Sequence, residues 1–454
     1  MDGNDQILTG FKMAIWPDCD SQSKRLYERG LKVYPGGITR LVPWLEPFPV
    51  YAKFGKGAYV TDVDGTSRLD LLNNFASLIH GHANPAIIDA VSRQLVLGTA
   101  YTNPTEVEIE LAELLCDRIE TAENVRFSNS GSEAVMSAIK AARAYTGRPA
   151  IVKVEGSYHG SYDYAEVSLD TPKEEFATPP KSVGYAAGVP DQLLEDVYVI
   201  PFNDPETAAQ IIRAHKDRIG AILLDAAPSY LGFTHVTPEF TATLRELATE
   251  IGAVFILDEV ISFRLDHGGA QKRFGIKPDL TVLGKIIGGG FPVGALVGSK
   301  EVMKVFDHHS GRPLVPWSGT FSANPITMTA GRVTLELLTP ALVAHINMLG
   351  DRVRARLTQA FASSGFPGQV TGVGSMFKII THPRPVYDYR SQQHTPAESA
   401  AMVVLQRLLV LKGFHVSGAG MGFLSTAMVD EDIDNFCAAT EECLRHLPHP
   451  GSVE

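Results

Sequence analysis

Cysteine and tryptophan are scarce in this chain, and long apolar runs are absent from it. Only four cysteines and three tryptophans occur among 454 residues, and no apolar run approaches the ~18 residues that a membrane-spanning helix needs. The cysteines form no CxxC pair and have no ligand-like spacing with histidine, so neither a disulfide framework nor a zinc site is expected. We expect four free, buried thiols in a reducing compartment: Cys19, Cys116, Cys437 and Cys443.

Positive charge is also in deficit. The 40 Lys and Arg residues face 51 Asp and Glu residues, which gives a formal net charge of −11 at pH 7. A negative surface argues against bulk binding of nucleic acid or of an anionic membrane. The N-terminus lacks the basic and apolar segments of a signal peptide, so a cytoplasmic location is expected. Only glycine is in mild excess, at 41 residues.

Short apolar runs alternate with helical patterns through the middle of the chain. The helical patterns include 104–119 and 237–252, where apolar residues recur at helical spacing. Short β-rich runs alternating with such helices predict an α/β fold, with a mostly parallel sheet covered by helices on both faces. The runs that read as strands lie around 149–156, 220–227, 253–262, 279–285 and 294–299.

The pattern changes on either side of this region. The first 50 or so residues read as irregular, and from residue 324 long helices alternate with a few short strands. We therefore expect a large domain over 69–329 and a smaller α+β domain over 330–454. The segment 1–68 is expected to belong to the smaller domain.

The segment Phe127–Glu133, FSNSGSE, is a candidate phosphate site. A strand that ends in Ser-Asn-Ser-Gly-Ser and opens directly into a helix presents free N–H groups, hydroxyls and the positive helix end together. The alternative is an ordinary capping box, in which Ser130 and Glu133 satisfy the first turn of the helix.

Two further strands end in residues that can do chemistry. VFILDEV ends in Asp258 and Glu259, and DLTVLGK ends in Lys285. Ligand-binding groups gather at the carboxyl ends of parallel strands, and burial can lower the pKa of such a lysine and free its amine for Schiff-base chemistry. The alternatives are an aspartate that caps the next helix and a lysine that reaches the surface. The glycines Gly288–Gly290 follow the lysine instead of preceding it, so a Walker phosphate loop does not fit.

Together these three features match the needs of pyridoxal 5'-phosphate. This cofactor needs an anion site, a carboxylate that keeps its ring nitrogen protonated, and a lysine amine. Tyr158 and His159, which follow another strand, could stack against a flat ring and orient the carboxylate.

The chain resembles the class III aminotransferases of pyridoxal phosphate fold type I, among them glutamate-1-semialdehyde aminomutase and β-amino acid aminotransferases. Matching motifs run through nearly the whole chain, in family order: YPGGITR, DVDG, GHANPAI, NSGSEA, GSYHG, FND, DEVISFRLDHGGAQKRFGIKPDLTVLGKIIGGGFPVGALVG and SGTFSANP. The resemblance implies a seven-stranded, mostly parallel sheet in the large domain. It also implies a homodimer with shared active sites and small-molecule amino acid and oxo-acid substrates.

The resemblance also implies roles for individual residues. Lys285 becomes the Schiff-base lysine, and Asp258 the partner of the pyridine nitrogen. The remaining cofactor-binding residues are the phosphate-cup residues Ser130, Gly131 and Ser132, the ring-stacking Tyr158, the supporting His159, Val260 on the other ring face, and Thr320, which reaches the neighbouring subunit's phosphate.

Substrate residues follow the family less closely. Arg40, in PGGITR, matches an arginine of the β-amino acid subgroup, and we interpret it as a carboxylate-binding residue. A solvated or interfacial arginine is the alternative. Phe75 and Phe263 are candidate pocket aromatics, although such residues are as often core. The usual Glu-Pro after the central strand is here Asp225-Ala226, and Ser417–Ser425 lacks the C-terminal arginine of the subgroup.

These observations predict an aminotransferase that moves an amino group from an amino acid to an oxo-acid. A β-amino or an aryl- or D-amino acid is the favoured donor. An aminomutase, which moves nitrogen within one molecule, is the main alternative. A nucleotide-binding dehydrogenase or a non-catalytic α/β protein is more distant, because no GxGxxG follows the first strand. No metal is expected.

Overall fold

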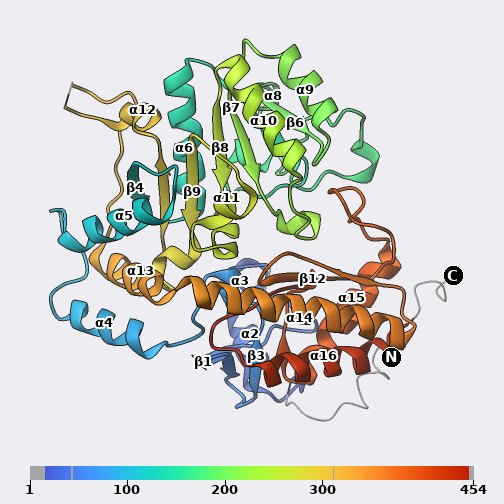
Figure 1. Ribbon diagram of the computed structural model, residues 1–454. Coiled ribbons are helices and arrows are strands. Elements are labelled where there is room, and N and C mark those ends of the chain that lie inside the picture. Colours follow the sequence, from blue (N-terminus) through green and yellow to red (C-terminus); the bar gives the residue numbers. More distant parts are fainter. Residues whose placement is uncertain (1–15, 42–43, 310, 449–454) are drawn as a thin grey trace. The chain divides into compact units, whose positions relative to one another are not determined.

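The chain folds into two units, each built from separate segments. The computed structural model describes residues 16–41, 44–309 and 311–448 (Figure 1). The large unit comprises Pro85–Ala344 and Val386–Gln392. The small unit comprises the described residues up to Asn84, His345–Pro385, and those from Gln393 onward.

A seven-stranded sheet forms the centre of the large unit. Its strand order is β4-β10-β9-β8-β7-β5-β6, and β10 alone runs antiparallel to its neighbours β4 and β9. The predicted mostly parallel sheet is therefore confirmed. The strands are β4 (Asn124–Ser128), β5 (Ala150–Val154), β6 (Val197–Ile200), β7 (Ile219–Asp225), β8 (Val254–Asp258), β9 (Leu280–Gly284) and β10 (Gly294–Gly298).

Helices of the large unit pack along this sheet. Helix α6 crosses β10, β9, β8 and β7, while α10 packs on β7 and β8, and α9 on β6. Strands β5, β7, β8, β9 and β10 are buried along their whole length, which explains their unbroken apolar runs. The helices are α4 (Pro85–Leu95), α5 (Glu106–Arg118), α6 (Gly131–Thr146), α7 (Asp163–Glu166), α8 (Asp191–Glu195), α9 (Pro205–Ala214), α10 (Pro238–Ile251), α11 (Gly269–Phe274), α12 (Lys300–Met303) and α13 (Pro325–Leu337).

The small unit contains two further sheets and a core of its own. One sheet has the order β1-β2-β3-β13 and the other β11-β12-β14. The strands are β1 (Ala52–Lys56), β2 (Tyr59–Asp62), β3 (Ser67–Asp70), β11 (Gln369–Thr371), β12 (Met376–Ile380), β13 (Phe414–His415) and β14 (Met421–Phe423). The helices are α2 (Gln22–Gly30), the short turn α3 (Asn73–Ala76), α14 (Pro340–Ser364, which begins in the large unit), α15 (Pro396–Leu411) and α16 (Asp430–Leu444).

Several sequence expectations differ from the structure. The N-terminal region is not wholly irregular, because Ser21 accepts a hydrogen bond from Lys24 N (3.2 Å) and begins helix α2. The expected domain boundaries at residues 69 and 330 differ from the unit boundaries after Asn84 and Ala344. Strand β3 spans the expected boundary at residue 69 and pairs with β13 of the small unit. Helix α13 spans the expected boundary at residue 330 and packs on α4 and α5 of the large unit.

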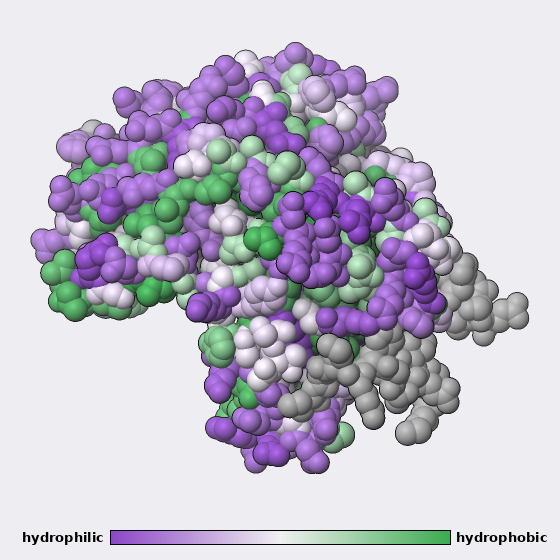
Figure 2. Space-filling view, turned by 60° about the horizontal axis from the view of Figure 1, so that its bottom comes forward, coloured by the Kyte–Doolittle hydropathy of each residue, from purple (hydrophilic) through white to green (hydrophobic). Residues whose placement is uncertain are grey.

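The four cysteines are free, as expected, but not all are buried. Cys437 and Cys443 are buried, Cys116 is half-buried and Cys19 is exposed. No single helix among the described residues meets the length and apolarity of a membrane span; α13 and α14 do so only when the bent pair is counted together. Polar side chains alternate with apolar patches over the surface (Figure 2).

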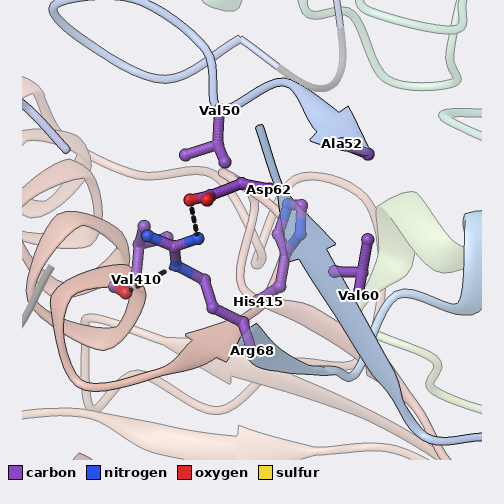
Figure 3. Close-up of a pocket in the computed structure, with 7 residues that line it drawn as sticks. All are labelled: Val50, Ala52, Val60, Asp62, Arg68, Val410 and His415. Atoms are coloured by element: carbon purple, nitrogen blue, oxygen red, sulfur yellow. Dashed lines mark hydrogen bonds and ion pairs between the residues drawn. The ribbon is translucent and has the colours of Figure 1, made fainter. Parts of the chain in front are cut away.

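A buried ion pair lies in the small unit, beside a small cavity (Figure 3). Arg68 donates to Asp62 Oδ2 (2.6 Å) and to Val410 O (2.9 Å), and both charged side chains are about 1% exposed. The adjoining cavity, which His415 also lines, has a volume of about 30 Å³. This is space for about one water molecule, so the cavity belongs to the core and is not a substrate site.

We expect Arg68→Met to lower the free energy of unfolding by about 3–5 kcal/mol, because Asp62 would remain as an unpaired buried carboxylate. Denaturant unfolding followed by circular dichroism measures the change. The control is Lys24→Met, which breaks the exposed Lys24–Glu28 pair and should change stability little. Equal losses in the two variants would contradict the importance of the buried pair.

Candidate active site

Three parallel strands and the segments after them bring the predicted site residues to one edge of the large sheet. Strand β8 ends at Asp258, and β9 ends at Gly284, directly before Lys285. The loop after β5 carries Tyr158 and His159. Because β5, β7, β8 and β9 are parallel, their carboxyl ends lie at the same edge.

Asp258 is held by donors from two segments. His159 Nδ1 lies 2.8 Å from Asp258 Oδ2, and Val260 N donates to Asp258 Oδ1 (2.9 Å). Asp258 is 5% exposed and His159 only 1%. Burial lowers the pKa of His159, while Asp258 partly opposes the shift. The carboxylate accepts from Nδ1–H, so a neutral imidazole leaves Nε2 without a proton, and this buried atom has no hydrogen-bond partner among the described residues.

The start of helix α6 forms both the predicted cap and the predicted cup. Ser130 Oγ accepts from Glu133 N (3.2 Å), and Glu133 Oε2 accepts from Asn129 N (2.7 Å). The capping box, which is the alternative to a phosphate site, is therefore present. The first N–H groups of a helix have no partner within it, so those of Gly131 and Ser132 remain available at its positive end. A cap at Ser130 is therefore compatible with the predicted anion site at the next two residues.

Close glycine contacts join the cup to the strand end before Lys285. A Cβ on Gly131 would lie 2.9 Å from Val260 Cγ2, and one on Gly284 would lie 3.3 Å from Val260 Cγ1. A Cβ on Gly160 would lie 2.4 Å from Ser132 Oγ, which also accepts from Ser161 N (3.0 Å). At Gly131 and Gly160 a side chain would force its neighbours to shift, and at Gly284 the fit is tight, so the cup and the loop after β5 pack closely together.

Lys285 has a left-handed backbone conformation and an amine of lowered pKa. Its φ is +50°, in the left-handed region that side-chain-bearing residues rarely adopt. Such strain persists where surrounding structure over-determines it, often at functional sites. Burial lowers the pKa of the Lys285 amine to about 8, against the opposing carboxylates of Asp258 and Asp225. A sizeable fraction of the amine is then unprotonated near neutral pH, as a nucleophile requires.

Asp225 is a second carboxyl group beside Asp258. The two residues are paired in the register of β7 and β8, and Asp225 is 6% exposed. Burial and the charge of Asp258 raise the pKa of Asp225 to about 8, although Ala227 N donates to it (2.9 Å). Burial likewise raises the pKa of Glu259 to about 7, despite hydrogen bonds from Ala270 N and Gln271. The alternative of an aspartate that caps the next helix does not describe Asp258, because it is Glu259 that accepts from the start of α11.

The remaining cofactor residues lie at the surface of the large unit. Tyr158 is 39% exposed and stacks on Tyr230, with ring centroids 6.3 Å apart and an interplanar angle of 26°. Thr320 is exposed in the segment before α13. An open aromatic face and an exposed hydroxyl are compatible with the predicted roles.

The three predicted substrate residues differ in how exposed they are and in which unit they belong to. Arg40 is exposed and donates to Asn74 Oδ1 (3.0 Å), next to the half-buried Phe75, all within the small unit. Phe263 is 1% exposed, and a Cβ on Gly269 would lie 2.9 Å from its ring. The structure thus places Phe263 in the core, where it fixes the turn before α11, and not in an open pocket.

Sequence reasoning missed a buried lysine in β5. Lys153 is fully buried and donates to Val167 O (2.6 Å), and burial lowers the pKa of its amine to about 7. A charged residue within the apolar run IVKV was the available signal. It also missed Tyr389 and Arg390, whose sequence gives no periodic or motif signal.

We expect cofactor-free protein carrying Asp225→Asn to gain stability over the wild type as the pH rises from 5.5 to 8.5. The raised pKa means that the folded wild type binds a proton that the unfolded chain has already released above pH ~4. Wild-type stability therefore falls with pH until the pH passes the folded pKa of about 8, by at most about 1.4 kcal/mol per pH unit.

Denaturant unfolding at several pH values measures this difference. The control is Asp217→Asn, at an exposed carboxylate of the same unit. A stability difference between Asp225→Asn and wild type that does not depend on pH would contradict the proposed environment of Asp225.

The chain matches known proteins along most of its length. The family model of class III aminotransferases covers residues 42–434. Glutamate-1-semialdehyde 2,1-aminomutase from Methanothermobacter thermautotrophicus is 37% identical over 94% of this chain and 99% of its own. A crystal structure of an omega-transaminase from Sphaerobacter thermophilus is 46% identical, with a TM-score of 0.92 over 95% of this chain and 99% of its own.

Two further solved structures bear on the chemistry. A transaminase with pyridoxal phosphate bound is 40% identical, with a TM-score of 0.87 over 93% of this chain and 96% of its own. A β-phenylalanine aminotransferase from Variovorax paradoxus is 32% identical, with a TM-score of 0.86 over 97% of each chain.

The residues at the sheet edge fit pyridoxal phosphate, which is bound in one of these transaminase structures. The free N–H groups at the start of α6 suit its phosphate, the buried Asp258 its ring nitrogen, and the amine of Lys285 its aldehyde. The cofactor is pyridoxal 5'-phosphate, and the predicted family and fold are confirmed. The chain belongs to the class III aminotransferase family, with the fold type I architecture of pyridoxal phosphate enzymes.

Proposed function

We propose that the protein is a transaminase that moves an amino group from a β-amino acid, or an aryl- or D-amino acid, to an oxo-acid. The observation that carries this proposal is one sheet edge at which an anion-binding helix start, a buried Asp–His pair and a lysine of lowered pKa meet. The 46% identity to an omega-transaminase supports amino transfer between molecules.

Each residue at this edge has a separate task. Pyridoxal phosphate, when bound, supplies an electrophilic carbonyl and an electron-withdrawing ring. Gly131 and Ser132 would hold its phosphate through their backbone N–H groups. Asp258 would hold the proton on its ring nitrogen, with His159 fixing the orientation of the carboxylate. The Nζ atom of Lys285 would anchor the cofactor and, once released by the donor amine, take the substrate proton and return it at another carbon.

The structure of the small unit supports Arg40 as the residue that binds the donor's carboxylate. Its partner Asn74 belongs to a run of four residues with positive φ, Asn73–Ala76, none of which is glycine. Left-handed residues of this kind cost about 1–2 kcal/mol each. The turn persists because Asp70 accepts from the N–H groups of Asn73 and of Leu72 just before it, and because the Asn73 side chain donates to Phe423 O (2.7 Å). Strain maintained at such cost is typical of ligand-binding segments.

A β-amino acid donor suits this arrangement. The solved β-phenylalanine aminotransferase, which this chain resembles over 97% of its length, supports the choice. Arg40 can form a bidentate pair with a carboxylate, and the neighbouring Phe75 can contact an aryl group.

An aminomutase is the second candidate. It has support of its own, because curated relatives named glutamate-1-semialdehyde 2,1-aminomutase are 37% identical over more than nine tenths of the chain. Both reactions use the same cofactor and the same lysine. They differ in whether the nitrogen returns to the molecule that supplied it.

We also propose a homodimer whose subunits share their sites. Large apolar side chains stand exposed on α5, after α4 and in the segment before α13, where a second subunit could bury them. They include Val96 (85% exposed), Leu314 (72%), Leu97 (71%), Phe321 (60%) and Ile109 (56%). Thr320 lies beside Phe321, so a partner that covers this segment would bring Thr320 toward the partner's site.

We expect the purified holoenzyme to transfer the amino group of β-phenylalanine to an oxo-acid, pyruvate or 2-oxoglutarate. One molecule of the new amino acid should form for each molecule of β-phenylalanine consumed. Chromatography of the amino acid products measures the transfer. Lys285→Ala should reduce turnover by about 10²–10⁴-fold or more, because the proton-moving amine is lost. If glutamate-1-semialdehyde is isomerised while no oxo-acid is ever aminated, the protein is an aminomutase and the transaminase proposal fails.

We expect Arg40→Ala to lower kcat/KM for carboxylate-bearing donors while leaving a carboxylate-free arylalkylamine unaffected. Losing hydrogen bonds to a charged group costs about 2–3 kcal/mol, or about 30- to 150-fold in kcat/KM. The control is Arg25→Ala, at another arginine of the small unit, which donates to the nearby backbone carbonyl of Asp20. Equal losses of kcat/KM for both classes of donor would show that Arg40 does not bind the carboxylate.

A further inference from the structure

A short segment, Val386–Gln392, is part of the large unit although the chain before and after it belongs to the small unit. We call this segment the strap. It closes on itself in a tight turn: Ser391 N donates to Asp388 Oδ1 (2.7 Å), and Asp388 N donates to Ser391 Oγ (3.0 Å). The turn presents two neighbouring side chains, Tyr389 and Arg390, to the rest of the large unit.

Arg390 holds the residue that follows strand β5. Its Nε and one terminal nitrogen donate to the two carboxylate oxygens of Glu155, at 2.8 and 3.0 Å. The same guanidinium donates to Ala177 O (2.6 Å) and lies 4.7 Å above the ring of Phe176. Glu155 is 4% exposed, so this is a largely buried, bidentate pair of the kind that fixes geometry most strongly.

Tyr389 holds the next residue of the same loop. Gly156 has a φ of +75°, and a Cβ there would lie 2.2 Å from the ring of Tyr389. Tyr389 is 2% exposed, and its hydroxyl donates to Asp170 Oδ1 (2.9 Å). The ring therefore packs flush against bare backbone at a position where only glycine leaves room.

The residues that the strap holds lead directly into the cofactor residues. Tyr158 and His159 follow Gly156 by two and three positions, and His159 lies 2.8 Å from Asp258. The backbone of this short stretch is held at a further point as well, because Gly156 N donates to Ser168 O (2.8 Å). Through Glu155 and Gly156, the strap therefore holds the backbone that leads into Tyr158 and His159.

We propose that Tyr389 and Arg390 are positioning residues for cofactor binding, acting through the Glu155–Gly160 loop on Tyr158 and His159. The proposal rests on the proposed function, and with it on the ring-stacking role that the family resemblance implies for Tyr158. Neither strap side chain belongs to the expected cofactor contacts, so its effect on the cofactor passes through the backbone of this loop.

The test compares Arg390→Met with Arg213→Met in wild-type background. Arg213 forms the same type of bidentate pair on an exposed face of the large unit, with Nε donating to Glu250 Oε1 (3.1 Å) and a terminal nitrogen to Oε2 (2.8 Å). Each apoprotein is titrated with pyridoxal 5'-phosphate, and the circular dichroism of the bound cofactor in its visible absorption band is recorded. For Arg390→Met we expect at least a tenfold rise in the cofactor's Kd and a loss of half or more of the dichroic amplitude. Arg213→Met should match the wild type in both.

Three further variants keep the test decisive if Arg390→Met does not fold. Glu155→Gln retains side-chain volume and should raise the Kd in the same direction. Tyr389→Phe removes the hydroxyl but keeps the ring on Gly156, and should change the Kd less than Glu155→Gln does. Arg390→Lys, which keeps the charge without the fork, should rescue part of the dichroic amplitude.

The proposal is overturned if Arg390→Met and Glu155→Gln bind cofactor within twofold of wild type with an unchanged dichroic band, or if Arg213→Met shows the losses expected of Arg390→Met. These readouts do not depend on amino transfer. A wild type that aminates no oxo-acid would remove the proposed function but leave this inference standing, whereas a working transaminase with unaffected strap variants would do the reverse.

Discussion

The hydrogen bond between His159 and Asp258 is the contact on which the rest of the site depends. A carboxylate at the end of a fully buried strand is costly unless donors compensate it. Asp258 receives one donor from its own chain two residues on, at Val260, and one from a loop almost a hundred residues earlier. The second donor fixes the loop that bears Tyr158, and the first fixes Val260. The two ring-facing residues expected on opposite sides of the cofactor are thus both set by one carboxylate.

Charge is distributed around this carboxylate in a way that favours a cation. Asp225, Asp258 and Glu259 lie at the same strand ends as a single amine, that of Lys285. Burial raises the pKa of Asp225 and of Glu259, which reduces the number of negative charges that the site must carry. A protonated ring nitrogen complements such an excess of carboxyl groups, and the cofactor would supply it. The predicted site for an anion lies separately, at the start of α6.

Those parts of the site that depend on strand ends were predictable from the sequence. Asp258 and Lys285 each follow a buried run, and the geometry of a parallel sheet then requires them to share an edge. The cup at Ser130–Ser132 was predictable because a strand led directly into a helix. The sequence does not encode in any local pattern that Gly131 and Gly284 touch Val260 from two sides. Nor does it indicate that Tyr389, some 230 residues after Gly156, fills the space that this glycine leaves.

Phe263 and Arg40 illustrate the limit for single residues. An aromatic residue a few positions after a catalytic strand can face a pocket or the core, and packing against Gly269 decides for the core. Arg40 follows a Pro-Gly-Gly turn whose motif predicts a position but no partner. Its hydrogen bond to Asn74 depends on a left-handed turn of four residues without glycine, which propensity argues against.

The division of residues between the two units explains why relatives with different reactions resemble this chain so closely. The expected cofactor contacts, from the α6 cup to Lys285, all belong to the large unit, whereas Arg40, Asn74 and Phe75 belong to the small one. The chemistry of amino transfer and of isomerisation makes the same demands on the first set. Under the role proposed for Arg40, a change of donor would act on the second set, which lies on a strained turn and at an exposed arginine and not in the buried sheet. Substitutions there would then alter substrate choice without disturbing the hydrogen bond that orients Asp258.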